Sequence, residues 1–255
     1  MILAAGRGER MRPLTDTVPK PLLEVGGKPL IVWQIEALAR AGLRDIVINH
    51  AWLGEHIEAA LGDGGRFGVR LRYSPEGEAL ESAGGIAHAL PLLVDGDPAA
   101  GKVFAVVSGD IFCAYDYRRL LPAAAAMAGA AQPHMHLVMV PNPPFHPKGD
   151  FALGAGGLLR LDGSERLTFG NIGLYDSRSF IDITPGARAA LGPRYRPARR
   201  TRPPAARRTC MRQSPHGYCN RAHRPRHRAV LETARNPRQP HAGRRRRRGG
   251  ARDCT

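Results

Sequence analysis

The sequence lacks the features that mark membrane and secreted proteins. Its apolar runs are far shorter than the roughly 20 residues of a membrane-spanning helix, and nothing at its start has the pattern of a signal peptide. Cysteine is scarce: there are 4, and only Cys113 lies in the first 193 residues. A disulfide framework is therefore excluded for that part, and we expect a cytoplasmic protein with no membrane partner.

The end of the chain has no lysine and very few large apolar residues. Residues 1–193 carry 18 Lys+Arg against 20 Asp+Glu, whereas residues 194–255 carry 20 Arg, no Lys and two acids. This last part contains one Val, one Leu and no Ile or Phe, so it cannot bury enough surface to offset the entropy of ordering. We predict a globular domain over 1–192 and a disordered Arg- and Pro-rich basic tail over 193–255.

The globular part alternates strand and helix patterns. Apolar or alternating runs indicate strands over 1–5, 45–49, 69–73, 103–107 and 137–140. Helical periodicity indicates helices over 28–41, 53–61, 85–93 (interrupted near Pro91) and 117–127, and shorter strand-like pieces follow at 158–161 and 167–175. The alternation predicts a doubly wound α/β fold, with a mostly parallel sheet and helices on both faces.

A glycine-rich segment directly follows the first predicted strand. Residues 3–22 read LAAGRGERMRPLTDTVPKPL, and Gly6 and Gly8 let the backbone approach a ligand with its N–H groups exposed. The segment is neither a Walker loop nor a complete dinucleotide fingerprint. Backbone donors with cations beside them suit a polyphosphate, and the cations here are Arg7, Arg10, Arg12 and Lys20.

The longer string G-x-G-x-R-M-x-P-L-T-x-x-x-P-K-P-L, from Gly6 to Leu22, resembles the signature of sugar-1-phosphate nucleotidylyltransferases. The resemblance implies a Rossmann-like fold with a nucleotide-binding half over about 1–112 and a sugar-binding half over 113–192. It also implies that the loop wraps a nucleoside triphosphate, with Arg10 and Lys20 as the catalytic residues. The loop residues expected to bind the nucleotide are Ala4, Ala5, Gly6 and Gly8.

A carboxylate follows the strand over 103–107, in the step Ser108-Gly109-Asp110. Ligands of open α/β sheets bind beyond the carboxyl ends of the strands, and a carboxylate there can hold Mg²⁺ against phosphate oxygens. The alternative is that Asp110 only caps the following segment. The family resemblance implies the metal role, with Mg²⁺ as the cofactor.

Two further regions resemble one subgroup, the uridylyltransferases that act on N-acetylmuramate 1-phosphate in cell-wall recycling. The first is residues 78–86, EALESAGGI, in which Ser82, Gly84 and Gly85 are expected to lie against the nucleobase. The second comprises 142–151 and 167–175, NPPFHPKGDF and LTFGNIGLY. There the resemblance implies a site for the sugar phosphate that includes Asp150, Asn171 and Gly173, although a sugar-phosphate lysine cannot be assigned by match.

The end of the chain departs from the family pattern. The resemblance implies a strand and a W-x-D-[IV]-G-T-P segment after residue 192, whose Asp is a second metal ligand, and this chain has neither. The bias toward Arg, Pro, Ala, Gly and His is typical of a GC-rich gene translated out of frame. We therefore expect a frameshifted tail and a sheet with an uncovered edge, and the alternative is a basic arm that contacts nucleic acid phosphates.

The expected reaction transfers a nucleotidyl group from UTP to N-acetylmuramate 1-phosphate and releases pyrophosphate. The alternatives within the family are mannose 1-phosphate with GTP, and glucose 1-phosphate with dTTP or UTP. A different class would be a nucleotide- or RNA-binding module without turnover. Nucleic acid is the less favoured partner because only two Tyr accompany the arginines of residues 194–255, and no pattern indicates an oligomeric state.

Overall fold

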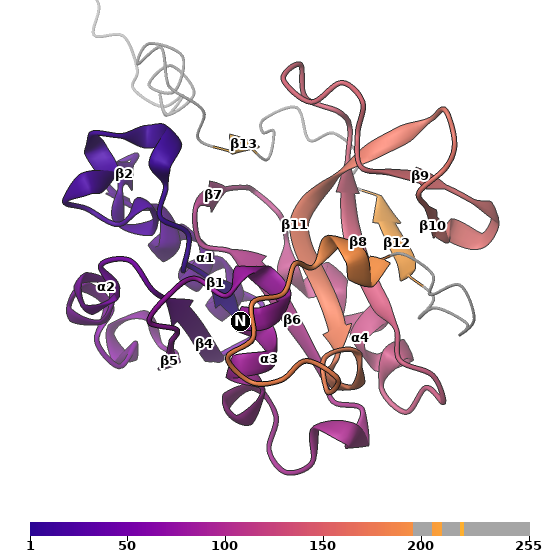
Figure 1. Cartoon of the computed structure of the whole chain (residues 1–255), viewed down its shortest axis with the longest axis horizontal. Coiled ribbons are helices and arrows are strands. Elements are labelled where there is room, and N and C mark those ends of the chain that lie inside the picture. The colour runs from indigo at the N-terminus through magenta and orange to yellow at the C-terminus, as the bar shows by residue number, and fades with distance from the viewer. Residues whose placement is uncertain (196–205, 211–219, 222–255) are drawn as a thin grey trace, which may run out of the picture. The chain divides into compact units, whose positions relative to one another are not determined.

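The computed structural model describes residues 1–195, 206–210 and 220–221, which include a nine-stranded sheet with helices around it (Figure 1). Most of the predicted tail lies outside these residues. The strand order is β10-β9-β11-β6-β1-β4-β5; β8 also pairs with β11, and β12 pairs with β8. In the part of the chain that the structure describes, no helix is long and apolar enough to cross a membrane.

The nucleotide-binding half predicted from the sequence contains a parallel sheet of four strands. These strands lie in the order β5-β4-β1-β6, and their carboxyl ends share one edge. Their bounds are β1 Ile2–Leu3, β4 Asp45–His50, β5 Arg70–Pro75 and β6 Val103–Ser108. The predicted doubly wound α/β class is confirmed, and the edge where these strands end is where a ligand of such a sheet binds.

The second half of the sheet is built around the long strand β11, Arg166–Asp176. β11 runs antiparallel to β6 on one side and to β8, Met135–Val140, on the other. The strand predicted over 137–140 therefore runs in the same direction as β6 but is separated from it by β11. A short hairpin of β9, Phe151–Leu153, and β10, Leu159–Arg160, extends the sheet beyond β11.

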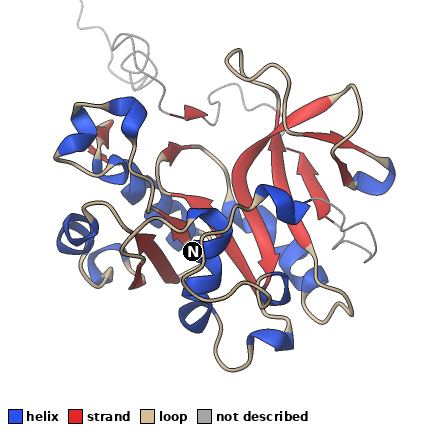
Figure 2. Ribbon diagram, viewed as in Figure 1, coloured by secondary structure: helices blue, strands red, loops and turns tan. Residues whose placement is uncertain are grey.

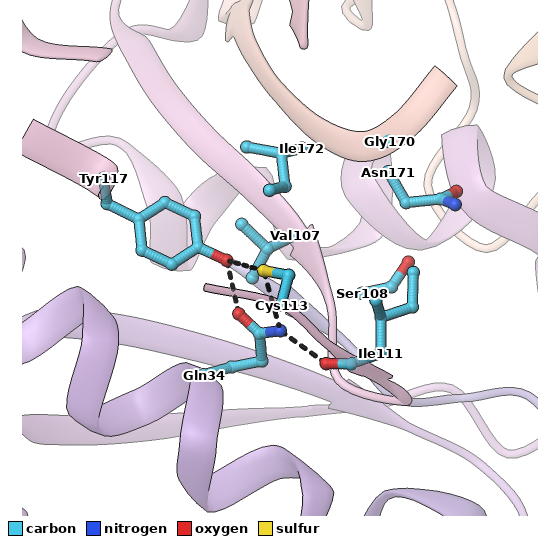
Figure 3. A pocket seen from close by; sticks show the side chains of 9 residues that line it. All are labelled: Gln34, Val107, Ser108, Ile111, Cys113, Tyr117, Gly170, Asn171 and Ile172. Atoms are coloured by element: carbon cyan, nitrogen blue, oxygen red, sulfur yellow. Dashed lines mark hydrogen bonds between the residues drawn. The ribbon is translucent and has the colours of Figure 1, made fainter. Parts of the chain in front are cut away.

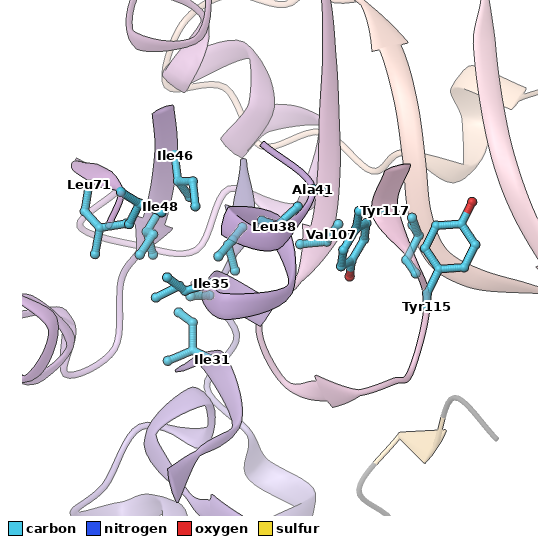
Figure 4. Close-up of a cluster of buried hydrophobic side chains, with 14 of the residues drawn as sticks. Ile31, Ile35, Leu38, Ala41, Ile46, Ile48, Leu71, Val107, Tyr115 and Tyr117 are labelled. Atoms are coloured by element: carbon cyan, nitrogen blue, oxygen red, sulfur yellow. The ribbon is translucent and has the colours of Figure 1, made fainter. Parts of the chain in front are cut away.

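Helices cover both faces of the sheet and create two cores (Figure 2). Neighbouring strand residues point to opposite faces: Ile46 and Ile48 pack in the core with α1, whereas Val47 packs with α3. Figure 4 shows Ile31, Ile35 and Leu38 of α1 in the first core. The helix bounds are α1 Leu30–Arg40, α2 Gly54–Leu61, α3 Glu81–Leu93 and α4 Leu121–Met127.

Short elements connect these layers. The predicted start of the first helix at Lys28 is wrong, because Lys28–Pro29 is a strand, β3, paired with β2, Glu24–Val25. A further strand, β7, spans Ile111–Phe112. The 3₁₀ helices are Glu9–Met11, Leu14–Asp16, Lys20–Leu22, Gly65–Phe67, Pro98–Ala100, Tyr117–Leu120, Ala155–Gly157, Ser177–Ser179 and Gly192–Tyr195.

The helix predicted over 85–93 differs from the observed α3 at two places. α3 begins four residues earlier, at Glu81, and it continues through Pro91 to Leu93 instead of being interrupted. Pro91 stands in the last turn, where the lost backbone hydrogen bond weakens only the end of the helix. Because α3 begins at Glu81, Ser82, Gly84 and Gly85 lie within its first turns.

The expectation of an uncovered sheet edge is wrong for the described residues. Strand β12, Ala206–Cys210, pairs in parallel with β8, and β13, Asn220–Arg221, pairs antiparallel with β7. Just after the predicted domain end at residue 192, the hydroxyl of Tyr195 lies 2.9 Å from that of Tyr175 in β11. Backbone pairing needs no apolar side chain, which is why the composition of this segment did not predict it.

Candidate active site

The glycine-rich loop lies between β1 and the first 3₁₀ helix, at the edge where the parallel strands end. Gly8 has φ +71°, a left-handed conformation that suits glycine. Its carbonyl accepts hydrogen bonds from the Met11 N–H at 2.8 Å and from the Thr15 hydroxyl at 3.0 Å. Gly6 is exposed, and a Cβ there would meet nothing within 4 Å. The loop is thus folded tightly at Gly8 and open to solvent at Gly6.

The amino-terminal end of this loop is fixed by a side-chain network that the sequence did not reveal. Asn49, 2% exposed at the end of β4, accepts a hydrogen bond from the Ala4 N–H at 3.1 Å. Its amide donates to Oε1 of Glu76 at 2.5 Å, and Oε2 of Glu76 accepts from the Leu80 N–H at 2.8 Å. The network joins the loop after β1 to the segment before α3. In the sequence, the signal for this role of Asn49 is that a polar residue stands at the end of an apolar strand.

Lys20 and Asp110, 90 positions apart in the sequence, form an ion pair of 2.6 Å between Nζ and Oδ2. The Lys20 side chain is 10% exposed and that of Asp110 is 31% exposed. The chain can bring them together because Gly109, whose N–H donates to the Leu3 carbonyl at 2.9 Å, passes close to β1. A Cβ on Gly109 would lie 2.9 Å from Cγ2 of Ile2. The structure thus joins a predicted catalytic lysine to the predicted metal ligand.

Arg10 stands on the 3₁₀ helix that follows the loop and is exposed. Within the described ranges it makes no ion pair, unlike Arg12, which lies 2.9 Å from Asp16. An exposed guanidinium beside open loop amides can donate to a phosphate without first breaking an ion pair. Its place is therefore compatible with its predicted role.

Gly84 and Gly85, predicted to lie against a nucleobase, have packing partners within the protein. The N–H of Gly84 donates to the Ala189 carbonyl at 3.0 Å, and a Cβ there would lie 2.4 Å from the Ala187 carbonyl. A Cβ on Gly85 would lie 2.3 Å from Oε1 of Glu76. Both glycines are required by close packing, so their small size is not evidence for a bound base. Ser82 is half-buried in the first turn of α3.

Asp150, predicted to bind the sugar phosphate, acts as an acceptor within the protein. Its Oδ2 accepts from the Phe169 N–H at 2.8 Å, and its Oδ1 lies 3.0 Å from Nε2 of His146. Asn142 holds the same loop to β11, because its amide donates to the Arg166 carbonyl at 2.9 Å. These contacts fix the loop over 142–150 on β11.

Asn171 and Gly173 lie on β11 where its pairing with β8 shifts register between Phe169 and Gly173. Asn171 has φ +55° at this irregularity, and it lies with Ser108 and Gln34 around a tightly packed spot that leaves no room for a water molecule (Figure 3). Gly173 is buried, and a Cβ there would lie 2.9 Å from the Tyr175 ring. Asn171 thus lies at the irregularity of β11, whereas packing explains Gly173.

Comparison with known proteins assigns the family. Residues 1–144 match the nucleotidyl transferase family. The chain belongs to this family. It is 51% identical over 198 residues to the N-acetylmuramate alpha-1-phosphate uridylyltransferase of Neisseria meningitidis serogroup B, covering 76% of this chain and 81% of the relative. The predicted kinship with sugar-1-phosphate nucleotidyltransferases is confirmed.

More distant relatives match a little under half of this nucleotidyltransferase. The catalytic subunit beta of mannose-1-phosphate guanylyltransferase from Danio rerio is 37% identical over 122 residues, 48% of this chain but 33% of the relative. Among solved structures, HddC from Yersinia pseudotuberculosis has a TM-score of 0.64 at 16% identity and covers 82% of this chain and 88% of its own. A putative glucose-1-phosphate thymidylyltransferase from Bacillus anthracis has a TM-score of 0.66 at 20% identity, and the match covers 83% of this chain and 85% of that structure's chain. At such identities, these two structures support the fold alone.

Proposed function

We propose that this nucleotidyltransferase transfers a uridylyl group from UTP to N-acetylmuramate 1-phosphate and releases pyrophosphate. The observation that carries the reaction type is the 2.6 Å pair of Lys20 and Asp110 beside an open glycine loop. The choice of substrates rests on the 51% identity to the Neisseria uridylyltransferase. In the reaction, an oxygen of the sugar phosphate attacks the α-phosphorus, and the bond from that phosphorus to the pyrophosphate oxygen breaks.

The protein's part in this reaction is to position the phosphates and to neutralise charge. Backbone N–H groups at Gly6 and Gly8 would donate to the triphosphate. The guanidinium of Arg10 and the ammonium of Lys20 would stabilise the charge that develops as pyrophosphate leaves. No side chain needs to form a covalent intermediate.

The metal site fits Mg²⁺ with one protein carboxylate. Asp110 offers a hard oxygen ligand beside the loop and is 31% exposed, while Lys20 occupies its Oδ2. No group of three or more His, Cys, Asp or Glu placed to hold a metal was found among the residues with described positions. Mg²⁺ often keeps several waters and binds through one or two carboxylates plus substrate phosphates. When bound, it would supply charge neutralisation at the phosphate oxygens.

We further propose that the enzyme works in the cytoplasm, in the recycling of cell-wall sugars. The surface of β11 around Asn171 is the proposed place of the sugar phosphate, and Ser82 with the start of α3 is the proposed place of the base. Asp150 would act by holding the loop over 142–150 in place, because both of its oxygens already have protein partners.

A panel of triphosphates and sugar phosphates tests the proposal. UTP, GTP and dTTP are each combined with N-acetylmuramate, mannose and glucose 1-phosphates, and pyrophosphate release is measured with Mg²⁺ present. The highest kcat/KM is expected for UTP with N-acetylmuramate 1-phosphate. A preference for GTP with mannose 1-phosphate would transfer the assignment to the guanylyltransferases. Tight UTP binding with no turnover on any sugar phosphate, also in a version whose tail is read in the alternative frame, would instead favour a binding module.

A further inference from the structure

Trp52 connects two parts of the glycine-rich segment. It lies between β4 and α2, and its indole Nε1 donates to the carbonyl of Thr15 at 3.2 Å. Thr15 is 2% exposed, and its hydroxyl donates in turn to the carbonyl of Gly8 at 3.0 Å. The position of the indole is thus linked to the turn at Gly8 through two consecutive hydrogen bonds.

A cationic side chain also stacks on the same indole ring. The guanidinium carbon of Arg7 lies 4.3 Å from the centroid of the Trp52 ring, a cation–π contact. Arg7 stands between Gly6 and Gly8, and no carboxylate of the described residues forms an ion pair with it. Stacking on an aromatic face leaves the in-plane N–H donors of a guanidinium available for other acceptors. An anion above the loop could therefore use them without breaking an ion pair.

The backbone next to Trp52 has an uncommon conformation. Leu53 has φ +51°, in the left-handed region that branched residues rarely adopt. Such a conformation costs free energy and persists only where surrounding contacts determine it.

We propose that Trp52 is a positioning residue for the triphosphate: it holds Arg7 above the loop and keeps the turn at Gly8 closed. The inference rests on the proposed function in that it takes a polyphosphate to be the ligand of this loop. It assigns no contact between Trp52 and the nucleobase. Binding energy should be lost when the ring is removed, because Arg7 and the loop must then be ordered by the ligand itself.

The other tryptophan provides a matched control. Trp33 makes the same two kinds of contact elsewhere, with Nζ of Lys28 at 4.0 Å from its ring centroid and its Nε1 2.9 Å from the carbonyl of Val25. In the Trp33→Phe protein, Trp52 is the single tryptophan, so tryptophan fluorescence reports on Trp52 alone. Its fluorescence is titrated with inorganic tripolyphosphate and with UTP at constant ionic strength, before and after Arg7→Gln.

The expected result is a saturable change in Trp52 fluorescence that Arg7→Gln diminishes. In a Trp33-containing protein, Trp52→Leu should weaken tripolyphosphate binding about tenfold, measured by calorimetry, from the loss of one cation–π contact and one hydrogen bond. Trp52→Phe, which keeps an aromatic face, should weaken binding only a few-fold. Trp33→Phe should alter it less than twofold.

Three further results separate the inference from the proposed function. Unchanged tripolyphosphate affinity in Trp52→Leu would overturn the inference, as would a KM for the sugar phosphate that rises as much as the KM for UTP. UTP binding through Trp52 as described, with no pyrophosphate release even when the tail is read in the alternative frame, would support the inference and refute the proposed reaction.

Discussion

Nζ of Lys20 lies 2.6 Å from Oδ2 of Asp110, across 90 positions of sequence. The pair joins the end of the glycine-rich segment to the end of β6, so the cation and the carboxylate predicted for the reaction lie side by side. The Lys20 side chain is the more buried of the two: it is 10% exposed, whereas that of Asp110 is 31% exposed. Each partner therefore sets the position of the other before any phosphate binds.

Removing either partner should slow the reaction strongly. We expect Lys20→Met and Asp110→Asn each to lower turnover by about 10²–10³, the scale of one preorganised electrostatic contact. Initial rates of pyrophosphate release measure this. The control is Lys28→Met, because Lys28 makes an ion pair of the same 2.6 Å with Glu36 away from the loop. Near-parental rates in Asp110→Asn would refute the metal assignment.

Loss of Asn49 should lower the stability of the fold and weaken UTP binding at the glycine-rich loop. Asn49→Ala leaves the Ala4 N–H and the Glu76 carboxylate without their shared partner. Urea unfolding should show a loss of about 1–3 kcal/mol, the cost of buried polar groups left unsatisfied, and the KM for UTP should rise. The exposed variant Asp45→Ala, which removes only a surface ion pair with Arg70, should change stability far less. Equal effects of the two variants would contradict the role of the network.

A methyl group at Gly84 should destabilise the protein. Its Cβ would lie 2.4 Å from the Ala187 carbonyl, so either α3 or the segment over 187–189 must move. We expect Gly84→Ala to lose about 1–3 kcal/mol, as for other overpacked sites, measured by urea denaturation. Gly192→Ala is the control, since a Cβ there meets nothing within 4 Å. If Gly84→Ala were as stable as the unchanged protein, α3 and the segment over 187–189 would not be closely packed.

His136 should make stability depend on pH. It is 5% exposed in β8, and burial lowers the pKa of its imidazole below the ordinary value of 6.5. The unfolded chain therefore takes up a proton first as the pH falls below 6.5, so stability declines from there down to the lowered folded pKa. His136→Gln should remove a slope of at most about 1.4 kcal/mol per pH unit. Urea titrations at several pH values measure it, with an unchanged m-value as the check that the same surface unfolds.

The departure of the tail from the family pattern predicts an impaired enzyme. The sequence after residue 192 supplies no second carboxylate in the expected segment, and a metal held by one carboxylate is bound more weakly. We expect this 255-residue chain to bind triphosphate yet turn over slowly. The comparison is with a version whose tail is read in the alternative frame, under identical Mg²⁺ and substrate. Equal kcat values would show that the expected segment is not needed.

The sequence by itself determined the fold class, the glycine loop and the candidate pair Lys20 and Asp110. Local patterns suffice there, because strand and helix periodicity and a long contiguous motif are properties of neighbouring residues. The sequence did not reveal where distant segments meet. β11 separates β6 from β8, and Gly84 and Gly85 are small because of Ala187 and Glu76.

Only the tertiary structure revealed the residues that hold the loop. Asn49 and Trp52 carry no motif, and their importance arises from hydrogen bonds to Ala4 and Thr15 that span 45 and 37 positions. The pairing of β12 with β8 was equally invisible, because main-chain hydrogen bonds are available to any composition. Sequence thus determined which chemical groups are present, whereas long-range packing decided which of them share one site.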